Sequence, residues 1–105
     1  MAQYIMLTRL SHEALKAPRS LTDLSDLISS RIAEECPAVR WLSSYATLGP
    51  ADYFDVFEAP DTETAMKVAT IIRTFGHATT EIWPALEWKR FRDLVRYLPS
   101  AIHGA

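Results

Sequence analysis

The segment between residues 48 and 61 constrains the fold more than any other part of the chain, because a turn, a strand and a helix start follow one another there. Residues 49–52 are rich in types that favour turns. Residues 53–59 are mostly aromatic, β-branched or otherwise apolar, which is typical of a strand. Pro60 ends that strand, and Asp61 is able to cap the next helix. A strand with regular structure on both sides is expected to lie centrally in a sheet.

The other apolar patterns predict the remaining elements and, with them, the fold. Strands are predicted at residues 3–9, 39–48, 53–59 and 78–83, and helices at 20–36, 61–76 and from about Pro84 to Pro99. Residues 11–20 are predicted to form a loop with at most one helical turn, because Pro18 interrupts any long helix, and residues 100–105 a frayed tail.

This order of elements predicts one domain over residues 1–105 with an α+β fold, the ferredoxin-like βαββαβ sandwich. Right-handed crossovers place the first and third strands in the middle of a four-stranded antiparallel sheet. Both main helices then cover one face, and a C-terminal helix follows.

The composition argues against several classes of protein. A formal net charge of −2 is unlike a strongly basic nucleic-acid-binding surface. No apolar run approaches the roughly 20 residues needed to cross a bilayer, and the N-terminus lacks the basic and apolar regions of a signal peptide. The single cysteine, Cys36, cannot form an intrachain disulfide, and no cysteine pair can hold zinc. We therefore expect a cytoplasmic protein with no nucleic-acid or membrane partner.

Alternation along the strands sorts their side chains into two faces. The more apolar face is expected to meet the helices, and contains Ile5, Leu7, Leu42, Ala46, Leu48, Phe54, Val56, Ala78 and Ile82. The other face contains Tyr4, Met6, Thr8, Trp41, Ser43, Tyr45, Thr47, Tyr53, Asp55, Phe57, Thr79, Glu81 and Trp83. This second face is large, aromatic and poor in charge, so we expect it not to stay exposed on a monomer.

A second copy of the same sheet is the simplest cover for the aromatic face, and it predicts a symmetric homodimer with a barrel-like interior. Tyrosine and tryptophan suit such an interface, because each buries a large area and keeps one polar group. The candidate ligand-binding or interface residues are Tyr4, Trp41, Tyr45, Tyr53 and Trp83. A higher homo-oligomer and a small-molecule ligand are further candidate partners. In a competing arrangement, the C-terminal helix folds back over its own sheet.

Four motifs match a known family. They are Tyr4-Ile-Met-Leu-Thr-Arg9, Leu48-Gly49 with Asp52, Glu58-Ala-Pro-Asp61 and Phe75-Gly-His-Ala-Thr-Thr-Glu81. Through them the chain resembles, from Tyr4 to about Leu94, the GYD-domain proteins, which are related to the dimeric α/β-barrel superfamily. The resemblance implies the ferredoxin-like fold and a dimer, and it assigns no reaction. The chain departs from the Gly-Tyr-Asp signature because Ala51 stands at the tyrosine position, so a role of that tyrosine would fall to Tyr53.

Two carboxylates on the predicted aromatic face are candidates for catalysis. Asp55 lies at the middle of a central strand, and Glu81 faces the same side from an edge strand. A covered carboxylate must be paired or hydrated, or its pKa rises, so the two would suit acid–base chemistry on a small substrate. In the structural alternative, both accept hydrogen bonds from Tyr, Ser and Thr side chains or pair across the dimer.

His77, at the junction of a helix and a strand, is the third catalytic candidate. It would serve as a proton shuttle or as a metal or haem ligand, since some dimeric α/β barrels bind haem through a histidine. No second histidine lies at ligand spacing, because His12 and His103 are in a predicted loop and tail. We therefore expect no metal and no cofactor, with haem bound through His77 as the alternative.

Two functions remain open at this point, and the chain is not assigned as an enzyme. The first is a self-associating module that holds a small molecule in a pocket beside the sheet. The alternative is a cofactor-independent isomerase or monooxygenase acting on a small aromatic or polyketide-like compound. A pocket decides between the two, because an enzyme needs a cavity with convergent polar groups and a perturbed pKa, whereas a plain dimer interface would be filled by its own side chains.

Overall fold

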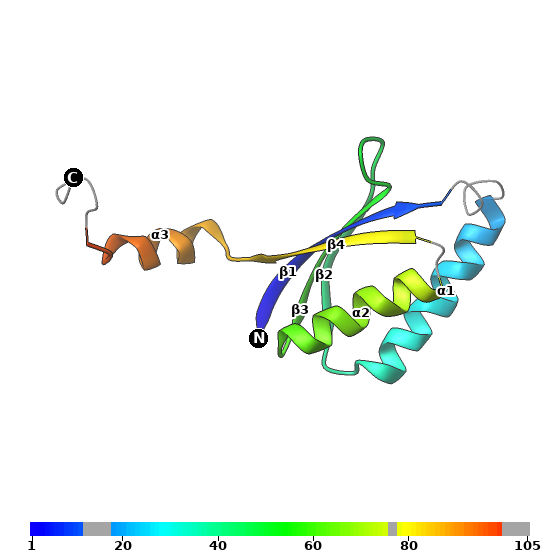
Figure 1. The fold of residues 1–105 in the computed structure, drawn as a ribbon, viewed down its shortest axis with the longest axis horizontal. Helices are drawn as coiled ribbons and strands as arrows, with labels where there is room; N and C mark the ends of the chain where they lie inside the picture. The colour runs from blue at the N-terminus through cyan, green and yellow to red at the C-terminus, as the bar shows by residue number, and fades with distance from the viewer. Residues whose placement is uncertain (12–17, 76–77, 100–105) are drawn as a thin grey trace.

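The computed structural model describes residues 1–11, 18–75 and 78–99, and at 18–20 it describes the backbone alone. Its elements are β1 (Ala2–Leu10), α1 (Pro18–Glu35), β2 (Arg40–Ala46), β3 (Tyr53–Ala59), α2 (Thr62–Phe75), β4 (Ala78–Ala85) and α3 (Trp88–Arg96) (Figure 1). The predicted loop at 11–20 is too long, since α1 already begins at Pro18. Proline is tolerated in the first helical turn, where its missing N–H has no partner to lose.

The four strands form one sheet in the order β2-β3-β1-β4, and every neighbouring pair is antiparallel. The two central strands are therefore β1 and β3, as predicted. Helices α1 and α2 both lie on one side of the sheet (Figure 1). The α+β ferredoxin-like fold predicted from the order of elements is confirmed.

Two local predictions near the ends of elements have different outcomes. Asp61 caps α2, because its Oδ1 accepts hydrogen bonds from the backbone N of Thr64 at 2.8 Å and from the Thr64 hydroxyl at 2.7 Å. Strand β4 runs past its predicted end and includes Pro84, which pairs with Tyr4. An edge strand accepts proline because the lost N–H need not complete a second ladder. The predicted terminator Gly76 lies outside the described residues.

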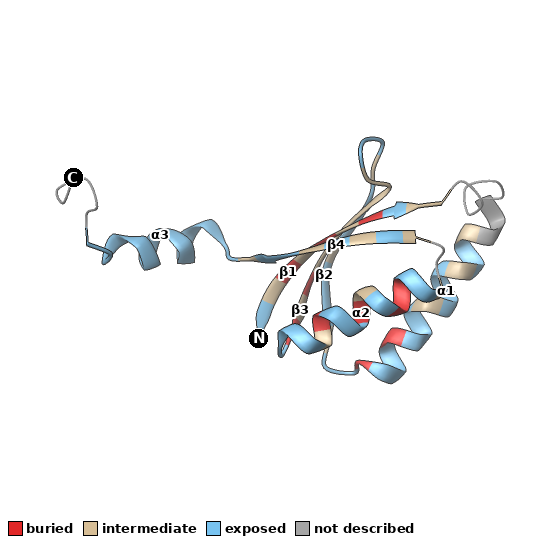
Figure 2. Ribbon diagram, in the orientation of Figure 1, coloured by how far each residue is buried: buried red, intermediate tan, exposed pale blue. Residues whose placement is uncertain are grey.

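The predicted assignment of the two faces is wrong on β1 and β3. Tyr4, Met6 and Phe57 of these strands are buried in the core with residues of α1 and α2, and the buried Thr8 lies on the same side. Figure 2 shows buried positions on the strands and on both helices. The opposite side, here called the open face, carries the partly exposed Ile5, Leu7, Phe54 and Val56. Alternation fixes which residues share a face, but both sets are apolar, so it could not decide which one meets the helices. On β4 the assignment is correct, since Ala78 and Ile82 pack against the core.

A β-bulge between Trp41 and Ser43 separates residues of β2 that were predicted to share a face. Trp41 is paired with the buried Phe57, and the two rings lie 5.2 Å apart. Tyr45 is paired with Phe54 on the open face. The extra residue of a bulge shifts the alternation beyond it, and it brings Ser44 opposite Asp55 on the helix side.

The loop between β2 and β3 is fastened to the end of β1 by several hydrogen bonds. Asp52 donates its backbone N–H to Thr8 O at 2.8 Å, and its Oδ2 accepts from the backbone N of Leu10 at 2.7 Å. Arg9 Nε donates to Pro50 O at 2.7 Å. The signature aspartate therefore extends the pairing of the two central strands by one residue before the start of β3.

Helix α3 projects away from the rest of the domain on the extended end of β4 (Figure 1), and all of its residues are exposed. The Cα radius of gyration is 16.9 Å, against about 13 Å for a compact domain of this length. The C-terminal helix therefore does not fold back over its own sheet, which was the competing arrangement.

We expect Asp52→Ala to lower the free energy of unfolding by about 1–3 kcal/mol, because it leaves the partly buried N–H of Leu10 without an acceptor. Urea unfolding followed by circular dichroism would measure the change. Asp52→Asn keeps a side-chain oxygen and should lose less. Equal stability of the alanine variant and the unchanged protein would contradict the role assigned to this carboxylate.

Candidate functional site

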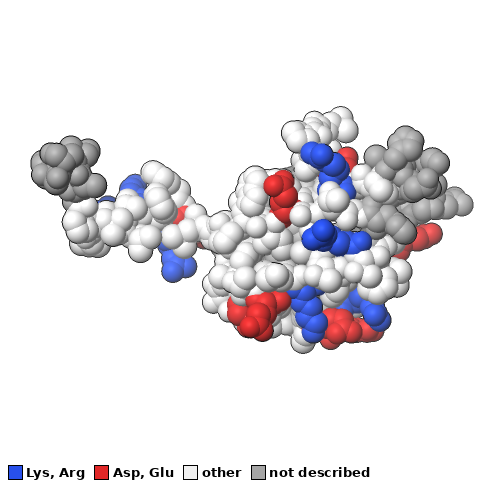
Figure 3. Space-filling model, in the orientation of Figure 1, with Lys and Arg blue, Asp and Glu red and all other residues white. Residues whose placement is uncertain are grey.

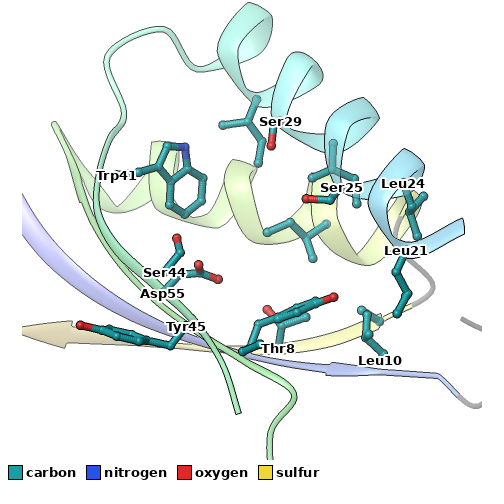
Figure 4. A pocket seen from close by; sticks show the side chains of 16 residues that line it. Thr8, Leu10, Leu21, Leu24, Ser25, Ser29, Trp41, Ser44, Tyr45 and Asp55 are labelled. Atoms are coloured by element: carbon teal, nitrogen blue, oxygen red, sulfur yellow. The ribbon is translucent and has the colours of Figure 1, made fainter. Parts of the chain in front are cut away.

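A cleft of about 370 Å³ lies between α1 and the helix side of the sheet (Figure 4). Its apolar lining comes from α1, α2 and the strands and includes Leu10, Leu21, Leu24, Ile28, Ile32, Trp41, Ala46, Tyr53, Ile72 and Ala78. Its polar lining consists of Thr8, Ser25, Ser29, Ser44, Tyr45 and Asp55. A volume of this size lies at the small end of ordinary ligand pockets.

The cleft exists because α1 packs against α2 more closely than against the sheet. Toward the C-terminal end of the helix, Ile32 is 2% exposed and belongs to the core. One turn earlier Ile28 is only partly buried, and Leu24 and Leu21 are also partly exposed at the cleft. The apolar stripe of α1 is thus used for packing at one end and lines the cleft at the other.

Asp55 is the charged group of the described cleft lining. It occupies the middle of β3, opposite Met6 on one side and Ser44 on the other. Its carboxylate points away from the sheet, toward α1 (Figure 4). Burial raises the pKa of this carboxyl above its ordinary value, and a hydrogen bond from the Ser44 hydroxyl partly offsets the rise. The remaining titratable side chains of the described lining are Tyr45 and Tyr53.

The predicted ligand-binding or interface residues lie at three different places. Trp41 and Tyr53 face the cleft, and Tyr45, which is 61% exposed, borders it while its ring packs on Phe54. Tyr4 is in the core, where its ring stacks on Phe57 at 5.6 Å and its hydroxyl lies 3.3 Å from Thr62 Oγ1. Trp83 is opposite Ile5 on the open face and is 47% exposed.

The three catalytic candidates do not come together in the described residues. Asp55 points to the helix side, whereas Glu81 is opposite Leu7 on the open face, so the sheet separates the two carboxylates. Glu81 instead lines a second, smaller hollow with Arg9, Pro50 and Ala51. His77 lies outside the described residues. The prediction that Asp55 and Glu81 lie together on one aromatic face is therefore wrong.

Sequence reasoning missed Ser25, Ser29 and Ser44 as lining residues. A signal for the first two is present in α1, since Leu21, Ser25 and Ser29 follow one another at intervals of four, beside the apolar stripe of Leu24 and Ile28. Ser44 reaches the cleft because of the bulge, which had no signal in the sequence.

Residues 1–11, 18–75 and 78–99 contain no group of three or more His, Cys, Asp and Glu side chains arranged to hold a metal ion. Over the same ranges, no helix has both the length and the apolar character that crossing a membrane requires.

We expect Asp55→Asn to increase the free energy of unfolding at neutral pH. The pKa of Asp55 is higher in the folded state, so the folded protein binds more protons than the unfolded chain between the ordinary value of 3.8 and the raised pKa. Stability contributed by this group therefore falls as the pH rises through that interval, and the loss persists at higher pH. Asparagine cannot ionise and avoids this cost.

Urea unfolding at neutral pH and well below pH 3.8 would measure this effect. The difference between the variant and the unchanged protein should shrink at the lower pH, where Asp55 is protonated in both states. Asp26→Asn, which alters an exposed carboxyl of α1, is the matched control. If the free energies of unfolding of the two variants depended on pH in the same way, the raised pKa of Asp55 would be contradicted.

Comparisons with known proteins agree with this architecture. The crystal structure of the Mycobacterium tuberculosis leucine response regulatory protein (LrpA) is similar with a TM-score of 0.51 and 15% sequence identity, over 82% of this chain and 51% of that one. The chain thus matches about half of that protein's length, and at this identity the likeness shows the fold alone. No curated protein was found to match the chain. The family model of the GYD domain matches residues 4–95, so the chain belongs to the GYD domain family.

Proposed function

We propose that the protein is a small-molecule-binding module that works as a homodimer, with the open faces of two sheets packed against each other and a ligand held in the cleft on the other side of each sheet. The observation that carries the dimer is the apolar centre of the open face. The volume and mixed lining of the cleft support the ligand.

The centre of the open face is a contiguous apolar patch on the two middle strands. Ile5 pairs with Val56, and Leu7 pairs with Phe54. Tyr45 on β2 and Trp83 on β4 flank this centre and are exposed. A sheet face that meets water normally alternates to polar residues, and an apolar patch of this extent on a monomer marks an interaction surface.

A second copy of the chain is the occupant that we propose for the open face. A two-fold contact brings the same patch from both molecules together, so an apolar centre meets an apolar centre. The loop between β2 and β3 rises from this side of the sheet, away from the helices (Figure 1). Leu48 in that loop is fully exposed and would extend the apolar contact.

Helix α3 supplies a second reason to propose a dimer. Its exposed apolar residues are Trp88, Phe91, Leu94 and Val95, followed by Leu98. Figure 3 shows basic side chains elsewhere on the same projecting segment. A helix this short has little stability unless its apolar side is packed. Exposed apolar residues of a second molecule offer such packing. We propose that α3 crosses to the partner molecule.

The cleft favours binding over the catalytic alternative. It offers one carboxyl, Asp55, as a candidate general base, with Tyr53 beside it on the same strand. Glu81, which the isomerase or monooxygenase hypothesis had paired with Asp55, is on the open face. Binding requires only the shape and polarity of the lining.

We expect Val56→Glu to dissociate the dimer, because it places a charge at the centre of a buried apolar contact. Sedimentation velocity over a range of concentrations should show a dissociation constant raised about a hundredfold or more. Met66→Glu introduces the same charge at an exposed apolar residue of α2 and is the matched control. A chain that is monomeric without any substitution, or a dimer indifferent to Val56→Glu, would overturn the proposed interface.

The role of α3 can be tested separately with Phe91→Glu, on its apolar side. If α3 packs on the partner, this variant should raise the dimer dissociation constant about tenfold or more. Arg92→Glu changes the charge of the neighbouring residue by more and should have a smaller effect. Should Phe91→Glu leave the constant unchanged, α3 would have no part in the contact.

A further inference from the structure

We infer that the cleft selects small molecules that combine an apolar body with a protonated nitrogen, and that Asp55 is the counter-ion of that nitrogen. This inference rests on the ligand binding proposed above and adds the chemical class of the ligand. It follows from where one carboxylate stands among the other groups of the cleft.

The charge of the described cleft lining is concentrated at one residue. Among the described lining residues, Asp55 carries the formal charge, and the others are apolar, hydroxyl-bearing or phenolic. The Ser44 hydroxyl donates to the carboxylate, and the two carboxylate oxygens together can accept further hydrogen bonds. A carboxylate in low-polarity surroundings is stabilised by a cation that also donates hydrogen bonds.

A ligand bound over Asp55 would change the hydration of its carboxylate. A neutral apolar ligand would remove water from the carboxylate and give nothing in exchange, which is costly for an ionised group. An anionic ligand would add repulsion. An ammonium group instead replaces the lost water with a charge-assisted hydrogen bond. The free-energy cost of burying the ionised Asp55 therefore discriminates between cationic and other ligands.

The apolar walls of the cleft suit the apolar body of such a ligand. Trp41 and Tyr53 form aromatic surface on the sheet side, and Leu24 and Ile28 form aliphatic surface on α1. The volume of about 370 Å³ fits one small ring system rather than an extended chain. The apolar walls would take the ring while the nitrogen reaches Asp55.

An ammonium group carries three N–H bonds, so it needs acceptors in addition to Asp55. Ser25 and Ser29 lie on α1, across the cleft from Asp55 (Figure 4). Their hydroxyl oxygens, and that of Ser44, are acceptors on the two sides of the cleft. A primary amine near Asp55 therefore has acceptors within the same lining.

The test uses three probes with one body: 2-phenylethylamine, 2-phenylethanol and 3-phenylpropionate, which are a cation, a neutral molecule and an anion at neutral pH. The chain has three tryptophans, Trp41, Trp83 and Trp88. In a protein carrying Trp83→Phe and Trp88→Phe, the fluorescence of Trp41 reports on the cleft. Titration should show the amine binding about tenfold or more tightly than the alcohol, and the anion more weakly still.

Variants assign the preference to Asp55. Asp55→Asn should weaken the amine about tenfold or more, and it should not weaken the alcohol, because asparagine removes the cost of covering an ionised carboxylate. Glu81→Gln, on the opposite face of the sheet, should change neither. Ser25→Phe adds bulk at an exposed lining position and should weaken all three probes together, which places binding in the cleft. Circular dichroism of each variant checks that it is folded.

The outcomes separate this inference from the proposed function. If the alcohol binds as well as the amine, or if Asp55→Asn leaves the amine unaffected, the ligand class is wrong although the cleft binds small molecules. If none of the three probes changes the Trp41 fluorescence and none shows saturation transfer in nuclear magnetic resonance, small-molecule binding at this cleft is refuted along with the class.

Discussion

The two middle strands are apolar on both of their faces, and the rest of the structure depends on this. Tyr4, Met6 and Phe57 fill the core beneath α1 and α2, while Ile5 and Val56 face the other way. Two helices can cover one face of a sheet and not both. The domain therefore completes one core by itself and leaves a second apolar layer that we propose is completed by a partner.

The cleft arises from an imbalance in how α1 is used. Its C-terminal half supplies Ile32 to the core, whereas Leu21, Leu24 and Ser25 in its N-terminal half line a cleft above β2 and β3 that side chains do not fill. A well-packed core would place a leucine or phenylalanine in the middle of β3. Asp55 stands there instead, with Ser44 beside it. A half-buried carboxylate weakens the fold, and such a cost is commonly found at functional sites.

Much of the fold was predictable from local patterns. The bounds of β3 follow directly from the turn residues before it and Pro60 after it, and the cap of α2 follows from Asp61. The order of strands followed from the succession of elements, because few topologies satisfy right-handed crossovers. The sequence misplaces the start of α1, because Pro18 predicts an interruption although proline is favoured in a first turn.

The candidate site was less predictable, for reasons that can be named. Asp55 stands out in the sequence as a carboxylate in a central strand, but strand alternation groups it with Glu81, and the sheet separates the two side chains. The bulge between Trp41 and Ser43 rearranged the faces of β2 without any mark in the sequence, since no glycine or proline accompanies it. Ser25 and Ser29 look like ordinary polar residues of a surface helix until the position of α1 is known.

The sequence by itself determined the elements, their order and which residues share a side of β1, β3 and β4, because these depend on local backbone preferences and on a side-chain period of two. Only the tertiary structure decided which side of β1 and β3 meets the helices. That choice compares the packing of Tyr4, Met6 and Phe57 against α1 and α2 with that of Ile5, Leu7 and Val56. Both sets are apolar, so the difference lies in how side chains far apart in the chain fit together, and no local pattern records it.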